Sequence, residues 1–350
     1  MPSIVVEGKA KILLNSTFYN PRMEFCRDLD MLVFQHFKSV ELLDAMAGTG
    51  IRGIRTKLEA DYETVVFNDR SKSAVETIKE NLRLNGLTAE VYCKDACILM
   101  RERRFEHVDV DPFGSPAKFV DSACFCAKKY LSVTATDTAA LCGSAVGAGL
   151  RKYSTYLIKT DVFHETGIRN LIGFIVKNAT KYDKVPVPIF SFIKEHYYRV
   201  YFEIRKSRSL ASKIYSQIGF LFYCPYCHSK QIAGNEGGFS KCGCGGTYVI
   251  LGPIWLGKLK SDEFVSEVER TAEGKLKNFI QKIKNEVDSP TVYNLRYISS
   301  KLKIGVPKTS SVVGKLRDEG YEASPTHYCG YCVKTNASLE QIINVLSDQV

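Results

Sequence analysis

From residue 40 onward the sequence alternates short runs of β-branched and apolar residues with amphipathic stretches of helical periodicity. The runs that predict strands are Val40–Leu43, Thr64–Phe67, Ala89–Tyr92, His107–Val110 and Leu131–Thr136, and the intervening stretches Ser71–Asn85 and Pro116–Tyr130 predict helices. Strands joined by helices at this spacing are typical of crossover units, which build a parallel sheet covered on both faces. The first half of the chain is therefore predicted to be a Rossmann-like α/β domain, whose ligands bind beyond the carboxyl ends of the strands.

The pattern changes after about residue 190. A long strand-like run (His196–Arg205) and a cysteine-rich segment are followed by helical stretches at Val265–Val287 and Thr291–Leu302 and an extended segment at Tyr321–Thr335. Helix, turn, helix and extended segment are typical of a winged-helix module, although periodicity alone does not distinguish it from other small α+β units. We therefore predict two domains, a Rossmann-like domain with an N-terminal extension at 1–190 and a smaller α+β domain at 191–350.

The net charge of +10 is distributed unevenly along the chain. Residues 1–150 hold 19 lysines and arginines against 20 acidic residues, whereas residues 151–350 hold 29 against 18. Basic side chains concentrated in one region neutralise phosphates and release counterions, which supplies much of nucleic-acid affinity. The second half is therefore predicted to bind nucleic acid, and the alternative is a basic solvated surface without a partner.

The sequence also bears on the compartment in which the protein works. It contains no run of about 18 apolar residues, the length that a membrane span requires. Its first ten residues include Glu7 and Lys9, where a signal peptide would be apolar. Of the 12 cysteines, Cys93, Cys97, Cys124, Cys126 and Cys142 stand singly in apolar segments, where free thiols behave as small core residues. We expect a cytoplasmic protein without a membrane partner.

The segment Leu42–Gly53 predicts a strand that enters a glycine-rich turn and then a helix. Such a turn lets the backbone approach dinucleotides, phosphates or S-adenosylmethionine. Asp69 ends the second predicted strand, where a carboxylate can accept both ribose hydroxyls of an adenosine. Asp95 and Ala96 end the third, in a suitable place for the adenine amine. The alternative is that each aspartate is only a helix N-cap; their joint placement favours the cofactor, S-adenosylmethionine.

The fourth predicted strand ends in Asp109-Val-Asp-Pro-Phe-Gly-Ser-Pro116, which resembles the D-P-P-Y type motif of amino-group methyltransferases. An exocyclic amine has its lone pair delocalised into the base, so it must be held by acceptors and aimed at the methyl carbon. Asp111 and the carbonyl of Pro112 are candidate acceptors, and Phe113 is a candidate to stack on the base. A plain Pro-Gly turn would explain Pro112 and Gly114 but not two acidic residues at an apolar strand end.

Several long motifs resemble those of one family, the tRNA (guanine-N(2))-dimethyltransferases that modify position 26, in their short archaeal form. They are Phe18–Asp28, Gly50–Arg55, Asp109–Pro116, Val133–Gly143, His164–Arg169, Gly252–Trp255, Thr326–Tyr328 and Val333–Thr335. The resemblance covers nearly the whole chain and implies a class I methyltransferase that adds one or two methyl groups to the N2 amine of guanosine 26.

The resemblance also implies roles for individual residues. Arg27 and Arg52 would contact the cofactor together with Asp69, Asp95 and Ala96, and Asp111 would be the catalytic carboxylate. Arg27 would pair with the methionine carboxylate or anchor the N-terminal loop through a bidentate contact. Cys26, Gly48 and Pro325 depart from the family's pattern. Pro325 replaces an arginine expected before Thr326 and His327, which leaves the RNA contact of that segment open.

Cys224-Pro-Tyr-Cys227 and Cys242-Gly-Cys244 resemble a four-cysteine zinc site, because closely spaced cysteines present thiolates to one tetrahedral ion. The single residue between Cys242 and Cys244 is tighter than the usual spacing, so His228 is an alternative ligand. We predict a structural zinc, and the alternative is an empty, reduced cluster. Cys329 and Cys332 have no partner pair in the sequence and are interpreted as free thiols or a disulfide.

Two other functions compete with a tRNA guanosine methyltransferase: an amino-methyltransferase acting on another RNA or DNA base, and a tRNA-binding protein without catalysis. Asp-Pro-Phe would suit an adenine amine as well, so only the family motifs argue against the first. The intact set Asp69, Asp95 and Asp111 argues against the second. We expect a monomer, because one asymmetric tRNA bound to two domains needs no symmetry partner.

Overall fold

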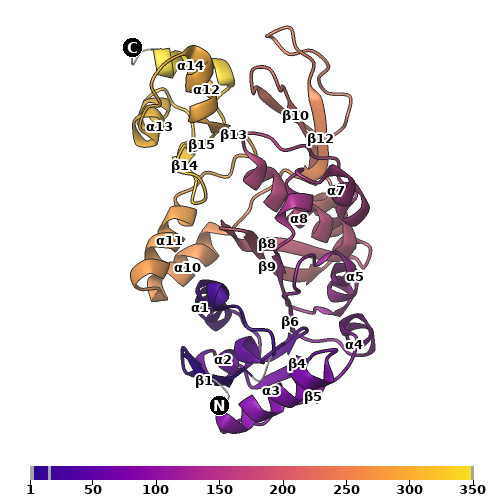
Figure 1. Ribbon diagram of the computed structural model, residues 1–350. Helices are drawn as coiled ribbons and strands as arrows, with labels where there is room; N and C mark the ends of the chain where they lie inside the picture. Colours follow the sequence, from indigo (N-terminus) through magenta and orange to yellow (C-terminus); the bar gives the residue numbers. More distant parts are fainter. Residues whose placement is uncertain (1–3, 15–16, 348–350) are drawn as a thin grey trace.

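The computed structural model describes residues 4–14 and 17–347 and is built around a seven-stranded sheet (Figure 1). The strand order is β5-β4-β3-β6-β7-β9-β8. The parallel strands are β3 (Glu41–Asp44), β4 (Thr64–Asn68), β5 (Val91–Tyr92), β6 (His107–Val110) and β7 (Tyr130–Ala135). All five predicted strands are present, and the Rossmann-like α/β class is confirmed.

Helices cover both faces of this sheet because neighbouring strand residues point to two different cores. Leu43 and Val66 face one core, whereas Leu42 and Val65 face the other. The first core packs against α4 (Ala96–Glu102), α5 (Ala117–Cys126) and α8 (Phe163–Thr180), and the second against α1 (Glu24–Gln35), α2 (Ile51–Glu59) and α3 (Lys72–Leu84). The helix predicted at Pro116–Tyr130 is shorter, since Tyr130 already begins β7.

Short elements surround the parallel strands. Before them come a hairpin of β1 (Ile4–Glu7) and β2 (Ala10–Leu13) and a single 3-10 turn, η1 (Pro21–Met23). Between β7 and α8 lie α6 (Thr138–Leu141) and α7 (Val146–Tyr153). None of the helices in the described part of the chain is long and apolar enough to cross a membrane.

The expected division between residues 190 and 191 falls inside a strand. β8 (Lys184–Lys194) and β9 (Tyr197–Lys206) form an antiparallel pair, and β9 joins the edge of the parallel sheet at β7. Their aromatic side chains, including Tyr197, Tyr198 and Tyr201, are buried in the two cores of the sheet. The change of pattern after residue 190 therefore marks a change of strand direction, and the sheet continues to Lys206.

After the sheet, α9 (Arg208–Tyr215) leads into a small antiparallel sheet of β10 (Ile218–Tyr223), β11 (Lys230–Ala233) and β12 (Val249–Trp255). The helical stretch predicted at Val265–Val287 consists of two helices, α10 (Asp262–Thr271) and α11 (Gly274–Lys284). The break has a local cause: Ala272 and Glu273 are extended, and Gly274 has a φ of +53°, in the left-handed region.

The chain ends in a compact unit with its own core, which we call the C-terminal module (residues 289–347). It contains β13 (Val292–Asn294), α12 (Leu295–Leu302), α13 (Thr309–Asp318), β14 (Ala323–Pro325), β15 (Cys332–Thr335) and α14 (Leu339–Ser347). Its three strands are antiparallel in the order β13-β15-β14. Figure 1 shows the module at the opposite end of the molecule from α3.

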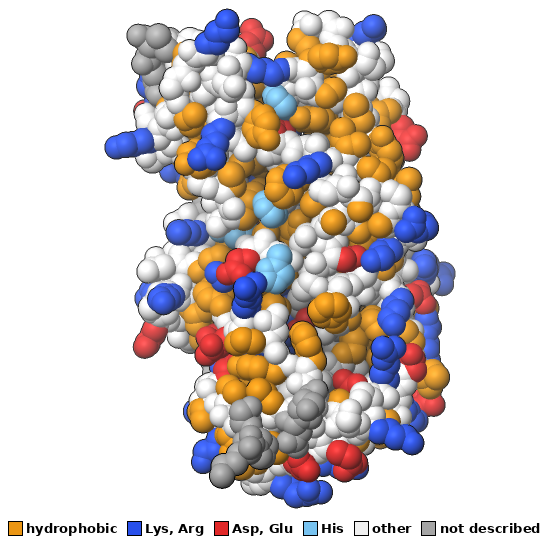
Figure 2. Space-filling model, in the orientation of Figure 1, with side chains coloured by type: hydrophobic (Ala, Val, Ile, Leu, Met, Phe, Trp, Pro, Cys, Tyr) orange, Lys and Arg blue, Asp and Glu red, His pale blue; other side chains and the backbone are white. Residues whose placement is uncertain are grey.

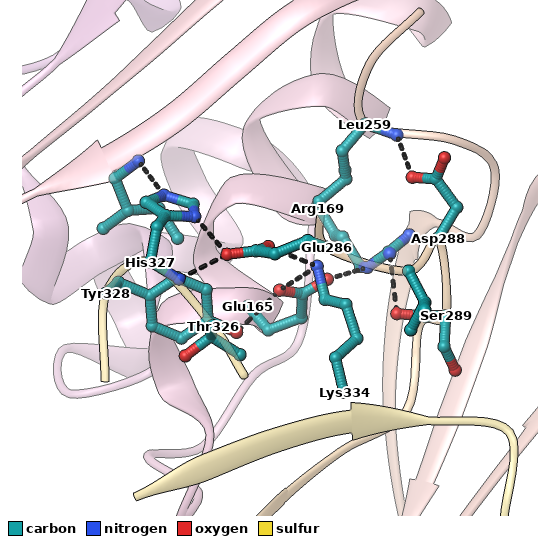
Figure 3. Close-up of polar contacts among 12 residues, drawn as sticks. Glu165, Arg169, Leu259, Glu286, Asp288, Ser289, Thr326, His327, Tyr328 and Lys334 are labelled. Carbon is teal, nitrogen blue, oxygen red and sulfur yellow. Dashed lines mark hydrogen bonds and ion pairs between the residues drawn. The ribbon is translucent and has the colours of Figure 1, made fainter. Parts of the chain in front are cut away.

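A buried polar network holds the C-terminal module against the part of the chain that contains the seven-stranded sheet (Figure 3). We call it the polar joint, and its members are Glu165, Arg169, Glu286, His327, Tyr328 and Lys334. Lys334 Nζ from β15 lies 3.1 Å from Glu165 Oε2 on α8 and 3.3 Å from Glu286 Oε2, which follows α11. A single buried ammonium thus neutralises carboxylates from two other parts of the chain.

The same network reaches the end of β8. His327 Nδ1 lies 2.6 Å from Glu286 Oε1, and His327 Nε2 accepts the backbone N–H of Ile193 at 2.9 Å. Because that N–H is a fixed donor, His327 is the neutral tautomer whose proton is on Nδ1. The Thr326–Tyr328 motif therefore lies inside the molecule, where His327 connects the C-terminal module to β8 and to Glu286.

Candidate active site and metal centre

Two adjoining cavities, of about 320 and 380 Å³, lie beyond the carboxyl ends of the parallel strands. They share Phe18, Met46, Gly48, Asp111, Pro112 and Phe113. The first cavity also contains Arg27 and Arg52, and the second contains Asp69, Asp95 and Ala96. The structure therefore brings all the predicted catalytic and cofactor residues to the walls of two cavities that meet at Asp111.

The two aspartates of the second cavity have different local roles. Asp95 is the N-cap of α4, because its Oδ1 accepts the N–H of Cys97 at 2.8 Å. Asp69 is not a cap: Ser71 caps α3, while Asp69 Oδ2 accepts the N–H of Gly48 at 3.0 Å and ties β4 to the glycine-rich turn. Capping thus accounts for one oxygen of Asp95 and for neither oxygen of Asp69.

The glycine-rich turn packs closely at two of its positions. Gly50 has a φ of +81° directly before α2, a conformation that side chains with a Cβ rarely adopt. Gly53 lies against the ring of Phe67, where an added Cβ would come within 2.4 Å. Asp44 Oδ2 accepts the N–H of Gly53 at 3.2 Å, so the start of α2 is fixed to β3.

Arg52 connects the cavity to a buried group of carboxylates. Its guanidinium donates to Asp111 Oδ2 and Asp30 Oδ2, and its Nε lies 3.4 Å from Asp109 Oδ2. Burial alone would lower the pKa of Arg52, but Asp111, Asp30 and Asp109 outweigh it and raise that pKa well above its ordinary value. Arg52 is therefore a permanent cation that holds the side chain of Asp111 at the meeting point of the cavities.

A second arginine supports this arrangement from behind. Arg199 of β9 donates to Asp30 Oδ1 from Nε at 3.0 Å and from Nη2 at 2.7 Å, and to Thr134 Oγ1 at 2.9 Å. Its Nη2 also lies 2.7 Å from Asp109 Oδ1, as an ion pair without the alignment of a hydrogen bond. Sequence reasoning missed Arg199 and Asp30, since neither belongs to a local motif and they are 169 residues apart.

Arg27 has a partner that the sequence did not indicate. It makes a bidentate contact with Glu7, Nε to Oε1 and Nη2 to Oε2, both at 2.6 Å. Nη2 also donates to the carbonyl of Asn20 at 3.1 Å. Of the two roles suggested for Arg27, the observed contacts are those of an anchor for the N-terminal hairpin and loop. Arg27 also lines the first cavity, and its contact with the cofactor stays a prediction.

The Asp111–Gly114 turn projects an aromatic ring into the open space between the cavities. Phe113 is 90% exposed and meets Phe18 edge to face, with ring centroids 5.7 Å apart. Thr136 fixes the turn, because its Oγ1 accepts the N–H of Gly114 at 2.9 Å and its own N–H donates to the carbonyl of Gly114 at 3.0 Å. Thr136 and His196 also line the first cavity, and sequence reasoning singled out neither.

The four predicted cysteines lie together, two in the turn between β10 and β11 and two in the connection from β11 to β12. The sulfurs of Cys224, Cys227, Cys242 and Cys244 all lie within 4.8 Å of one another, and this donor set is compatible with zinc. The alternative ligand His228 is outside the group, and its Nδ1 is 2.6 Å from the hydroxyl of Tyr223. Cys329 and Cys332 lie elsewhere, as a pair with sulfurs 2.7 Å apart.

Comparisons with known proteins show which family the chain resembles. The sequence model of the family described as N2,N2-dimethylguanosine tRNA methyltransferase matches residues 2–347. The tRNA (guanine(26)-N(2))-dimethyltransferase of Archaeoglobus fulgidus is 53% identical over 342 residues, which cover 98% of each chain. The enzyme of the same name from Methanobrevibacter smithii is 37% identical, over 94% of this chain and 90% of the relative.

A solved structure shows the same fold over nearly its whole length. Trm1 from Pyrococcus horikoshii in complex with S-adenosyl-L-methionine superposes with a TM-score of 0.90 at 34% identity, covering 98% of this chain and 99% of that one. The family predicted from the motifs is thereby confirmed. This chain belongs to the N2,N2-dimethylguanosine tRNA methyltransferase family.

Proposed function

We propose that this chain transfers one or two methyl groups from S-adenosylmethionine to the N2 amine of guanosine 26 in tRNA. The observation that carries the proposal is the position of Asp111, Pro112 and Phe113 on the shared wall of two cavities. One cavity has the residues expected for an adenosine, and the other is open to a flipped base. A methyl donor and an amine acceptor can therefore meet at Asp111.

The residues of the second cavity fit the adenosine part of S-adenosylmethionine. Asp69 would accept the ribose hydroxyls, and Asp95 with the backbone of Ala96 would face the adenine amine. Arg52 and Arg27 line the other cavity, where they would face the methionine end. When bound, the cofactor supplies an electrophilic methyl group, and the residues around it supply only its position.

Asp111 would act as an acceptor for the target amine. Its Oδ2 accepts a hydrogen bond from Arg52, whereas its Oδ1 accepts none from the residues that the structure describes. Oδ1 can therefore accept one N–H of the amine. The carbonyl of Pro112 would accept the other N–H, so that the nitrogen is aimed at the methyl carbon. After transfer the nitrogen carries an extra proton, which Asp111 can accept.

Phe113 and Phe18 would hold the guanine ring. Both rings border the two cavities and are exposed, at 90% and 64%, although large aromatic side chains are usually covered. A base removed from a helix is commonly stacked on aromatic side chains, which covers the same apolar surface. Guanosine would thus complete an aromatic cluster that is incomplete in the protein alone.

We further propose that the region after Lys206 binds the body of the tRNA, with a structural zinc at the four cysteines. The excess of lysine and arginine in residues 151–350 supports contacts to phosphates. The grouped sulfurs support the zinc, which would be held by Cys224, Cys227, Cys242 and Cys244. The protein would act as a monomer in the cytoplasm.

The test is incubation of the purified protein with labelled S-adenosylmethionine and unmodified tRNA transcripts, followed by nucleoside mass spectrometry. We expect mono- or dimethylguanosine, which disappears when guanosine 26 is changed to adenosine. Asp111→Asn should bind tRNA normally and lose about 100-fold or more of the rate, because the acceptor is weakened. Methylated adenosine, or tRNA binding without any methylated product, would contradict the proposal.

A further inference from the structure

A group of aromatic and cationic side chains lies where the C-terminal module meets the β10–β11 hairpin that carries Cys224 and Cys227, which we call the cysteine hairpin. Arg296 and Tyr297 are on α12, Tyr331 directly precedes β15, and His228 follows Cys227. The guanidinium carbon of Arg296 is 3.5 Å from the centroid of the Tyr331 ring, and the rings of Tyr297 and His228 are 5.2 Å apart. These two contacting pairs meet at neighbouring residues of α12, and we call the four residues the α12 platform.

Core packing does not explain why these rings are where they are. Leu295 and Ile298 of α12 point into the core of the module, whereas Arg296 and Tyr297 point outward. Tyr297 is 49% exposed and Tyr331 is 40% exposed. Exposed rings gathered at one place leave apolar surface in water, which is a common mark of a binding site.

The cations around the platform also lack partners. Arg296, Lys303 and Lys308 are exposed, and none of them forms an ion pair with an acidic residue in the part of the chain that the structure describes. Some other lysines of the second half are paired, as Lys260 is with Asp262 and Lys284 with Glu269. Figure 2 shows lysine and arginine side chains among hydrophobic ones over the upper part of the face in view, where Figure 1 places the C-terminal module and β10.

We propose that the α12 platform binds RNA, with an unpaired base stacked on the exposed rings of Tyr297 and Tyr331 and with Arg296, Lys303 and Lys308 at phosphates. Aromatic faces next to cations are the combination that binds nucleotides, because every base has a face to stack and every phosphate a charge to neutralise. An acidic protein would need the cations but not the rings. This inference rests on the proposed function, in which tRNA is the substrate.

The place of the platform makes it a second contact, separate from the methylated guanosine. The polar joint (Figure 3) fixes the C-terminal module to α8 and to the end of β8. The turn between β8 and β9 carries His196, which lines the first cavity. The distance between the platform and Asp111 is therefore set by buried contacts. A tRNA that reaches both places at once would be positioned for methylation before its base is flipped.

The test compares the Kd for tRNA of the full-length, zinc-loaded protein with that of the R296A/Y297A variant. We expect at least a tenfold weaker Kd and a matching rise in the KM for tRNA, with the Kd for S-adenosylmethionine unchanged. Alanine favours helix, so α12 should persist, and an unchanged Tm would verify this. The matched control is K128A/L84A, which removes one cation and one exposed apolar side chain outside the region after Lys206 and should bind tRNA as the wild type does.

Salt dependence separates stacking from charge. Lys308→Ala should reduce the slope of log Kd against log salt concentration by roughly one, whereas Tyr297→Ala should weaken binding without changing that slope. An unchanged Kd for R296A/Y297A would overturn the inference, as would a Tyr297→Ala variant that binds like the wild type while Lys308→Ala is weakened. A wild-type protein that makes no methylguanosine would overturn the proposed function instead, and the Kd comparison would still decide the platform.

Discussion

Asp44 shows how strongly the interior of this site acts on a single carboxyl group. It ends β3 below the first cavity and is 4% exposed. Burial and the nearby Asp109 raise the pKa of Asp44 to about 7, although Arg52 opposes them. Asp44 keeps its place by accepting the N–H of Gly53, a contact that a protonated carboxyl or an amide can also make. The negative charge of Asp44 therefore destabilises the folded state, whereas its oxygen stabilises the start of α2 by accepting the N–H of Gly53.

This shift predicts a pH dependence of stability. A carboxyl whose pKa is higher in the folded than in the unfolded protein binds more protons when folded, so its effect on stability becomes more unfavourable as pH rises from about 4 to about 7. Asp44→Asn removes this effect, so the stability of the variant relative to the wild type should increase over that range and then level off. Urea unfolding of both proteins between pH 5 and 8.5 measures it, with Asp28→Asn as a partly exposed control. A constant difference would show that Asp44 ionises normally.

Helices, strands and turns could be predicted from the sequence where they depend on residues that are close together in the chain. The five parallel strands, α3 and the glycine-rich turn were found because periodicity and glycine spacing are local properties. The strand predicted at His196–Arg205, which is β9, was assigned to a second domain because no local sequence pattern indicates which sheet a strand joins. The same limit hid the partners of known site residues: Glu7 for Arg27, Asp30 for Arg52, and Thr136 for the Asp111 turn.

The cysteine hairpin is an element whose structure depends on a ligand. Cys224 and Cys227 lie in the turn between β10 and β11, and Cys242 and Cys244 lie in the long connection between β11 and β12, where few apolar residues are buried. Zinc bound by the four sulfurs would therefore supply much of the order there. We expect one zinc per chain by elemental analysis, and Cys242→Ser should lose it and weaken tRNA binding while leaving the Kd for S-adenosylmethionine unchanged. Cys93→Ser is the control, because that exposed thiol lies outside the cluster. A full-length protein without zinc and with normal tRNA binding would contradict this.

Across the whole molecule, the polar joint relates the C-terminal module to the catalytic sheet. Its charges balance when His327 is neutral: two carboxylates, Glu165 and Glu286, face Arg169 and Lys334. Burial opposes ionisation of Glu286, but the hydrogen bonds that it accepts from His327 and the charge of Lys334 lower its pKa, so Glu286 stays charged throughout the neutral range. Such a network does little for net stability compared with apolar packing, but each member is required once the others are buried.

A substitution of Lys334 therefore tests whether the contact between the C-terminal module and the catalytic sheet positions the tRNA. Lys334→Met leaves Glu165 and Glu286 without their shared cation, and breaking a buried pair of this kind typically costs about 3–5 kcal/mol. We expect a lower unfolding midpoint and a higher KM for tRNA, with the Kd for S-adenosylmethionine unchanged because no member of the joint lines either cavity. Adding Glu286→Gln should restore part of the loss, since it removes one unpaired charge, and the double-mutant cycle measures that coupling. Lys128→Met, at an exposed position, is the control. If Lys334→Met lowered stability but left the KM for tRNA unchanged, the joint would hold the fold together without positioning the RNA.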